Sequence, residues 1–177
     1  METVDVDKPQ PERVRCRWVT DAALAQYHDV EWGQRPATDA DWFERVVLET
    51  FQAGLSWRTI LLKRPAFRRG FAQFEVNRVA AFGEEDVARL MADPGIVRNR
   101  KKVESALQNA RIAQSLIREY GSLGRFFTSL PVSDLLRVLQ KTFRFVGPTT
   151  AESIAIATGL LPAPHDHECW LAHQSHG

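Results

Sequence analysis

Both cysteines of the chain have histidines nearby, and together these side chains could bind a metal ion. Cys16 lies twelve residues before His28, and the segment HDHEC runs from His165 to Cys169 near the C-terminus. Two thiolates and two imidazoles can form a closed tetrahedral zinc site, which would join the two ends of the chain and leave no open position for catalysis. The alternative is two buried cysteines and unrelated surface histidines, because the two halves of the pattern are far apart in the sequence.

A second set of residues could bind a planar, cationic ligand. Trp18, Tyr27, Trp32 and Trp57 lie in the first third of the chain, and Glu49 lies in the apolar segment VVLETF. If Glu49 faces inward, its carboxylate needs a cationic or hydrogen-bond-donating partner. Aromatic faces beside a carboxylate suit a flat cation. The alternative is a tryptophan-rich core with Glu49 on the solvent side of its helix.

A third candidate is the turn FRFVGPTT at residues 143–150, which lies between two predicted helices. Gly147 and Thr149 would place backbone N–H groups at the start of a helix, where phosphate oxygens bind readily. The same sequence would also serve as an ordinary connection between two helices of an all-helical core. By itself, the motif leaves both interpretations open.

The basic residues are unevenly distributed, although the formal net charge is only +1. Segments 50–74, 94–103 and 135–151 hold 12 of the 23 lysines and arginines and no acidic residue. If these segments fold onto one face, that face would attract phosphate groups; the alternative is three separate solvated helix faces. The candidate phosphate contacts in the densest cluster are Arg98, Arg100, Lys101 and Lys102.

Helices are predicted along nearly the whole chain and must position these residues. Thr38 with Asp41 predicts a helix start, and this helix ends near Gly54. Ser56 caps a short helix, which Pro65 is expected to stop after residue 63. Apolar residues at helical spacing predict further helices over about residues 84–91, 99–120, 133–142 and 149–158. No strand-like alternation persists and no segment repeats, so the predicted fold class is all-α.

The length of 177 residues and the hydrophobic content of 44% predict one globular domain. We expect a disordered lead-in at residues 1–13, a single domain over residues 14–172 and a tail at residues 173–177. No apolar run is long enough for a membrane span, and the acidic N-terminus is not a secretory signal. Two cysteines cannot build a disulfide framework. These features predict a cytoplasmic protein, which we expect to be a monomer.

Several motifs, taken in order, resemble the 3-methyladenine DNA glycosylase I family. The resemblance covers roughly residues 14–170, almost the whole chain. Several spaced motifs in the same order are far more specific than any single motif. The matching segments are RCRW at 15–18, YHDVEWG at 27–33, LETFQAGLSW at 48–57, DVARL at 86–90, GIVRNRKK at 95–102, NA at 109–110, FRFVGPTT at 143–150 and GL at 159–160.

The resemblance implies a helix-hairpin-helix DNA glycosylase fold, with a structural zinc site that joins the termini and a base pocket between two helical subdomains. His165 is preferred over His167 as a ligand because it keeps the family's four-residue step to the cysteine. Asp166, which is next to a ligand, is expected to support the metal site rather than to act in catalysis. The implied zinc ligands are Cys16, His28, His165 and Cys169.

In the implied base pocket, Glu49 recognises the base and Trp57 stacks on it, with Tyr27, Trp18 and Trp32 as further aromatic residues. In the implied contact with DNA, the pair Gly54-Leu55 matches the pair that enters the duplex in such enzymes. The turn at Gly147 and Thr149 and the basic residues Arg98, Lys101 and Lys102 are expected to contact the phosphate backbone.

The implied activity is hydrolysis of the N-glycosidic bond of 3-methyladenine in alkylated double-stranded DNA, after base flipping. No lysine follows the hairpin, so no Schiff base and no strand cleavage are expected. Leu24 and Glu152 stand where the family commonly has tyrosine, and these departures bear on the range of bases accepted. The alternatives are a non-catalytic DNA-binding relative, a glycosylase of altered base specificity, and a zinc-containing interaction protein without a role on DNA.

Overall fold

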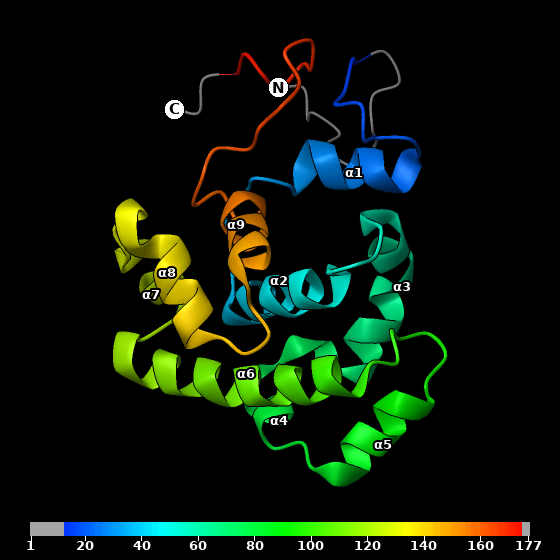
Figure 1. Cartoon of the computed structure of the whole chain (residues 1–177), viewed down its shortest axis with the longest axis vertical. Coiled ribbons are helices and arrows are strands. Elements are labelled where there is room, and N and C mark those ends of the chain that lie inside the picture. Colours follow the sequence, from blue (N-terminus) through cyan, green and yellow to red (C-terminus); the bar gives the residue numbers. More distant parts are fainter. Residues whose placement is uncertain (1–12, 175–177) are drawn as a thin grey trace, which may run out of the picture.

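A computed structural model describes residues 13–174, and every regular element in this part of the chain is helical, which confirms the all-α prediction (Figure 1). The predicted lead-in at 1–13 lies outside the described residues except for Arg13, as do residues 175–177 of the predicted tail. The elements are α1 (Ala22–Val30), α2 (Asp39–Gln52), α3 (Trp57–Gly70), the short 3-10 turn η1 (Ala72–Phe74), α4 (Val76–Ala80), α5 (Glu84–Ala92), α6 (Arg100–Tyr120), α7 (Leu123–Ser129), α8 (Val132–Thr142) and α9 (Pro148–Ala157).

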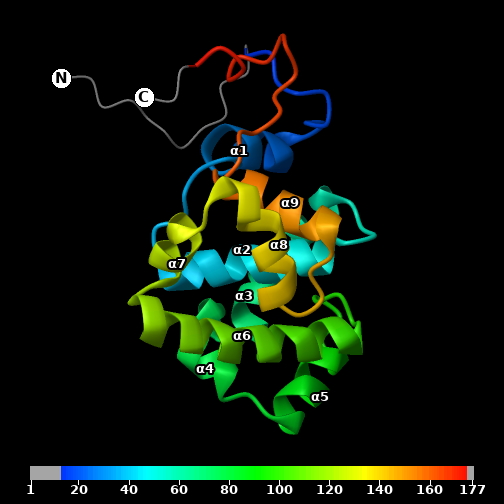
Figure 2. The ribbon, with the colours of Figure 1, turned by 60° about the vertical axis from the view of Figure 1, so that its left-hand side comes forward.

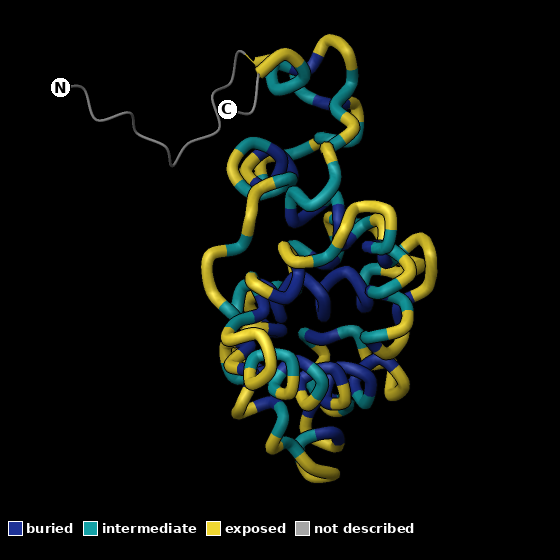
Figure 3. The backbone as a smooth tube through the Cα atoms, turned by 90° about the vertical axis from the view of Figure 1, so that its left-hand side faces the viewer, coloured by how far each residue is buried: buried dark blue, intermediate teal, exposed yellow. Residues whose placement is uncertain are grey.

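Helix α2 is the centre of the fold. It packs against α3, α6, α7 and α9, and the ten residues 42–51 are all buried (Figure 3). A helix that is buried around its whole circumference must be covered on several sides at once. The long helix α6 lies between α2 and the end of the molecule formed by α4 and α5, whereas α1 and the last described segment, residues 162–174, lie at the opposite end (Figures 1 and 2).

The helix boundaries follow local signals that are visible in the sequence. Thr38 and Asp41 form a reciprocal capping box at the start of α2, as predicted. The Ser56 side chain accepts from the N–H of Thr59 at the start of α3. At the end of α6, Gly121 has φ of 89°, the left-handed conformation that favours glycine at this position. The predicted helices near 84–91, 99–120, 133–142 and 149–158 are present within two residues at each end.

The prediction that Pro65 ends the third helix is wrong, because α3 continues to Gly70. Proline removes one helical hydrogen bond, but Pro65 itself is exposed, while Ala66, Phe67 and Gly70 beyond it are buried. Phe67 packs against Phe51 of α2, with their ring centroids 4.9 Å apart. Burial of this apolar face outweighs the loss of one bond.

Three short helices, α1, α4 and α7, have too little internal periodicity to be predicted from the sequence, and tertiary packing forms them. Helix α1 matters most for the candidate site, because it carries residues of both clusters described below. Within residues 13–174, no helix is both long enough and apolar enough to cross a lipid bilayer.

Candidate active site and metal centre

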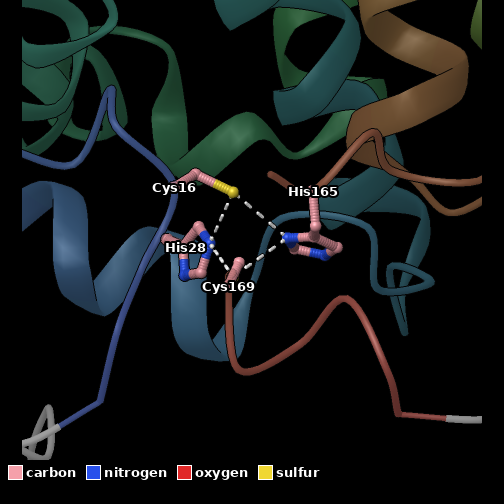
Figure 4. A group of neighbouring side chains, drawn as sticks. All are labelled: Cys16, His28, His165 and Cys169. Carbon is pink, nitrogen blue, oxygen red and sulfur yellow. Dashed lines mark hydrogen bonds between the residues drawn. The ribbon is translucent and has the colours of Figure 1, made fainter. Parts of the chain in front are cut away.

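Cys16, His28, His165 and Cys169 lie together, with one candidate ligand atom from each within 4.8 Å of all the others (Figure 4). His28 Nε2 is 3.3 Å from Cys16 Sγ and 3.4 Å from Cys169 Sγ. His165 Nδ1 is 3.5 Å and 3.6 Å from the same two sulfur atoms. The cluster therefore joins the N-terminal segment, α1 and the C-terminal segment, as the sequence predicted. His167 is exposed and is not part of it.

The spacing of these four side chains fits a tetrahedral metal ion. Zn–S bonds of about 2.3 Å and Zn–N bonds of about 2.0–2.1 Å, at a tetrahedral angle, place sulfur and nitrogen about 3.6 Å apart. The four S···N distances of 3.3–3.6 Å are close to this value. Burial raises the pKa of the Cys16 thiol to about 11, so a cation is needed to favour the thiolate at neutral pH. The donor set and its geometry both fit zinc.

Surrounding residues hold the cluster in place. Asp29 accepts from Nδ1 of His28 at 2.8 Å, which directs Nε2 of the same ring toward the sulfur atoms. The Asp29 carboxylate is itself held by Arg15 at 2.8 Å. Asp166 accepts from the backbone N–H of Arg17 at 2.6 Å, and its own N–H points to Cys16 Sγ at 3.3 Å. The expectation that Asp166 supports the metal site agrees with these contacts.

The aromatic residues predicted to form the pocket lie together around α1 and the start of α3. The ring centroids of Tyr27 and Trp57 are 5.1 Å apart, with their planes nearly perpendicular at 77°. Trp18 packs edge-on against Tyr27 and Trp32, with centroid distances of 6.4 Å and 5.1 Å. The ring centroid of Trp32 lies 5.0 Å from that of His165. The aromatic cluster and the metal cluster are therefore continuous, and α1 contributes to both.

Glu49 is buried in α2 with only 5% of its surface exposed, so the alternative that it lies on the solvent side of its helix is wrong. Burial raises the pKa of its carboxyl to about 8, against the opposing attraction of Arg45. Glu49 makes no hydrogen bond or ion pair with any residue between 13 and 174. The hydroxyl of Tyr27 is likewise buried, and no residue in that range meets it with good hydrogen-bond geometry, although Trp57 is close enough to oppose the rise in its pKa. Burial and the nearby Glu49 raise the pKa of Tyr27 well above its usual range.

The sequence analysis missed Arg45, which lies one helical turn before Glu49 and is also buried. Its guanidinium binds Glu31 at 2.8 Å and the carbonyl of Ala157 at 3.3 Å instead of pairing with Glu49. Glu31 is bound in turn by Arg64. Arg45 therefore supplies positive potential near Glu49 while leaving its carboxylate available to a ligand. The four-residue spacing on one helix is the signal that could have identified it.

The residues predicted to contact DNA are exposed, with one exception. Gly54 has φ of 84°, which favours glycine, and Leu55, 37% exposed, follows it in the turn between α2 and α3. Gly147 and Thr149 are exposed at the N-terminal end of α9. The exception is Lys102, which is buried, so its prediction as a phosphate contact is wrong in this structure. A buried ammonium must be hydrogen-bonded, and protein carbonyls satisfy it here.

The basic segments have no acidic residues in the sequence, but the fold brings acids to them. Within the described residues, five of the twelve basic residues in these segments are ion-paired, so part of their positive charge is balanced. Arg98 and Lys101 are exposed and make no ion pair with any other residue in the described part of the chain. The paired residues are Arg58 with Asp21, Arg64 with Glu31 and Glu44, Arg68 with Glu44, Arg100 with Glu84 and Glu104, and Arg137 with Asp134.

The two positions that depart from the family pattern differ in their surroundings. Leu24 is buried in α1, whereas Glu152 is exposed on α9. Leu24 therefore replaces a polar tyrosine hydroxyl with apolar surface on the helix that also carries Tyr27.

Glu49→Gln is expected to stabilise the free protein more at high pH than at low pH. The folded carboxyl has its pKa raised from 4.5 to about 8, so its contribution to stability is complete below pH 4.5 and is lost as the pH rises toward 8. Glutamine has no such loss. The difference in melting temperature between the variant and the wild type should grow by several degrees between pH 5 and pH 9. A change of about 1 kcal/mol in the free energy of unfolding shifts the melting temperature by roughly 2–4 °C. A difference that does not change with pH would show that Glu49 is ionised when folded.

Comparisons with known proteins point to one family. A family model described as methyladenine glycosylase matches residues 18–134. DNA-3-methyladenine glycosylase 1 of Escherichia coli (strain K12) is 38% identical over 176 residues, covering 86% of this chain and 92% of that protein. DNA-3-methyladenine glycosylase of Haemophilus influenzae is 31% identical, covering 88% of this chain and 96% of that protein.

Solved structures give the same result. A crystal structure of 3-methyladenine DNA glycosylase I matches with a TM-score of 0.79 at 35% identity, covering 89% of this chain and 98% of that one. A structure on 3-methyladenine recognition by the Staphylococcus aureus enzyme matches with a TM-score of 0.80 at 31% identity, covering 92% and 98% of the two chains. The chain belongs to the methyladenine glycosylase family.

Proposed function

We propose that this protein is a DNA-3-methyladenine glycosylase, which hydrolyses the N-glycosidic bond of 3-methyladenine in alkylated double-stranded DNA. The observation that carries the proposal is the Glu49 carboxyl, which is buried near Tyr27 and makes no hydrogen bond or ion pair with residues 13–174. Buried polar groups without partners are costly unless a ligand satisfies them. The named relatives of this chain are enzymes of the same activity.

The chemistry of the substrate explains why so few catalytic groups are needed. Methylation at N3 leaves the adenine formally cationic, so the base is already a good leaving group. The enzyme must flip the nucleotide out of the duplex, recognise the edge of the base and stabilise the sugar cation that develops as the bond breaks. The base departs as neutral 3-methyladenine with the electrons of the glycosidic bond, and water adds to the sugar and loses a proton to solvent.

Glu49 and the aromatic residues divide this task. The Glu49 carboxylate would accept a hydrogen bond from the exocyclic amine and favour the cationic base electrostatically. Trp57, which is partly exposed, would stack on the base, and Tyr27 would pack beside it. Each such stack contributes about 1–3 kcal/mol in other nucleic-acid complexes. Trp18 packs against Tyr27, and Trp32 packs against Trp18.

The metal centre would be structural in this mechanism. Cys16, His28, His165 and Cys169 would hold one zinc ion with all four protein ligands, leaving no position for water or substrate. A bound ion would cross-link the segments that carry Cys16 and Cys169 to α1. Because α1 also carries Tyr27, the metal centre helps to hold one wall of the base site in place.

We further propose a single glycosylase domain over residues 14–172, in which the base binds between two helical subdomains. Leu55 would enter the duplex at the flipped nucleotide, and the backbone around Gly147 would hold phosphate at the start of α9. No lysine follows the hairpin, so the product is an abasic site in an intact strand.

Arg98→Ala and Lys101→Ala are each expected to make the dependence of duplex binding on salt shallower. Each true phosphate contact contributes about 0.9 to the slope of log K against log salt. The control is Arg78→Ala, which removes an exposed arginine that pairs with Glu75 and lies outside the three basic segments. Slopes are measured by titration of a fluorescent duplex at several salt concentrations. Unchanged slopes for both variants would place the DNA on another face.

The proposed activity is tested by incubating the protein with methylated duplex DNA and identifying the released bases. Release of 3-methyladenine, with the strand left uncleaved, is the expected result. Duplex binding without base release would favour the non-catalytic DNA-binding relative. Release of a different alkylated base would favour a glycosylase of altered specificity. Leu24 is then the first position to examine, because it is buried in α1 three residues before Tyr27.

A further inference from the structure

Helix α6 directs two buried polar side chains at the backbone of other segments. Lys102 is 6% exposed, and Asn109 is fully buried. They are seven residues apart, which is about two helical turns, so they lie on the same side of α6. Lys102 forms no ion pair within residues 13–174. Both side chains instead bind backbone groups in or next to the segments that are proposed to contact DNA.

Lys102 holds the end of α2, directly before the turn that carries Leu55. Its ammonium donates to the carbonyl of Phe51 at 2.9 Å and to the carbonyl of Ala53 at 2.8 Å. Carbonyls at the C-terminal end of a helix lack partners within the helix and carry its negative partial charge, so they suit a cation. Gln52, the last residue of α2, donates across the turn to the carbonyl of Leu55 at 2.7 Å.

Asn109 holds the hairpin between α8 and α9. Its amide nitrogen donates to the carbonyl of Arg144 at 3.0 Å, and its amide oxygen accepts from the N–H of the same residue at 2.7 Å. One side chain thus satisfies both backbone groups of one hairpin residue. The next residue, Phe145, is exposed and has φ of 61°, a left-handed conformation that is costly for a bulky residue. The hairpin therefore depends on external contacts for its shape.

We infer that Lys102 and Asn109 are positioning residues, which set the turn at 53–56 and the hairpin at 143–147 at a fixed spacing along α6. This inference rests on the proposed function. Leu55 can enter the duplex at the target nucleotide only if the hairpin holds the phosphates in the matching register. Misplacement of reacting groups by about 1 Å can reduce a rate by about 100-fold. Lys102 therefore acts through the Leu55 turn rather than by touching DNA.

The test compares Lys102→Met and Asn109→Leu with a matched control on the same helix. Arg111→Met also removes a side chain of α6 that donates to two backbone carbonyls, but these belong to Ala80 and Phe82, in neither DNA-contacting segment. For each protein we would measure the single-turnover release of 3-methyladenine from duplex DNA, the affinity for free 3-methyladenine and the salt slope of duplex binding.

Release from the duplex is expected to fall at least tenfold for Lys102→Met and Asn109→Leu and to change less than twofold for Arg111→Met. Affinity for the free base should remain within twofold, because the base site lies on α1, α2 and α3. Lys102→Arg, which keeps a cationic donor, should recover part of the lost rate. A parallel loss of free-base affinity would instead show a merely structural role, and a salt slope shallower by about 0.9 would show that Lys102 contacts phosphate directly. Either result would overturn the inference.

A double substitution separates action through the turn from independent effects. If Lys102 acts through Leu55, then Lys102→Met combined with Leu55→Ala should slow release little more than the larger single effect. If the double variant instead loses rate by the product of the two single losses, the inference is contradicted. If the wild type is active and Lys102→Met and Asn109→Leu are equally active, the inference is overturned and the proposed function stays in place. A wild type that releases no 3-methyladenine would overturn the proposed function itself, and the inference with it.

Discussion

Glu49→Gln is expected to slow the release of 3-methyladenine from duplex DNA by about 10–100-fold. Glutamine keeps the shape of the side chain but removes the negative charge that favours a cationic base. The expected loss corresponds to roughly 1.4–2.7 kcal/mol, a reasonable value for one charge-assisted hydrogen bond in a site shielded from water. The measurement is single-turnover base release, with duplex affinity and metal content expected to remain unchanged.

The pH dependence of the same variant provides a sharper test. Burial raises the pKa of Glu49 to about 8, so the carboxylate fraction, and with it the rate, should rise as the pH approaches 8. The groups that face Glu49 are Tyr27 on α1 and Arg45 on α2, the latter paired with Glu31. Tyr27 stays protonated throughout, because its pKa is raised further. The rate of Glu49→Gln should not change over this range.

The control for Glu49→Gln is Glu119→Gln, the same substitution at an exposed position near the end of α6. It should release the base at the wild-type rate with the wild-type pH profile. If Glu49→Gln also keeps the wild-type rate, its carboxylate has no part in the reaction. If the variant releases the base more slowly but keeps the wild-type pH profile, a group other than Glu49 titrates near pH 8.

Cys169→Ser is expected to abolish zinc binding and to lower the melting temperature more than any of the other single substitutions named above. The wild type should contain about one zinc per chain. Structural zinc contributes about 10–16 kcal/mol to the folding of zinc-finger peptides, so the loss of even part of this contribution is large compared with a total stability of about 5–15 kcal/mol. Metal content is measured on the purified protein and unfolding by calorimetry.

His167→Ala is the matched control for the metal centre. His167 lies two residues from both His165 and Cys169 but is exposed and outside the cluster, so its variant should keep both the metal and the melting temperature. Removal of metal from the wild type by a chelator should reproduce the effect of Cys169→Ser. A metal-free protein that remains fully folded and active would contradict a structural role for zinc.

Much of the helical framework could be predicted because its signals are local. The capping box at Thr38, the cap at Ser56 and the left-handed Gly121 each act within four residues along the chain. The residue types of the metal cluster were visible in the sequence, since Cys16 lies twelve residues before His28 and Cys169 four residues after His165. Their contact across about 150 residues was implied by the family resemblance and not by their spacing.

The errors concern residues whose surroundings come from distant parts of the chain. Pro65 carries a local signal to stop, but the buried face of Phe67 continues α3 against α2. Lys102 has the charge of a phosphate contact, but the end of α2 covers it and provides two carbonyls. The basic segment around Arg64 has no acid in the sequence, yet Glu31 and Glu44 pair with it in the fold.

The sequence by itself therefore determined the fold class, most ends of the longer helices and the residue types of both clusters, because propensity, capping and periodicity depend on neighbours within a few positions. Only the tertiary structure decided which charges are solvated, which are paired and which are buried alone. Glu49 shows the difference most clearly: the fold buries it, while Glu31 and the carbonyl of Ala157 bind the Arg45 guanidinium that could have neutralised it. Such pairing depends on partners far apart in the chain, and it determines the pKa and hence the chemistry of the site.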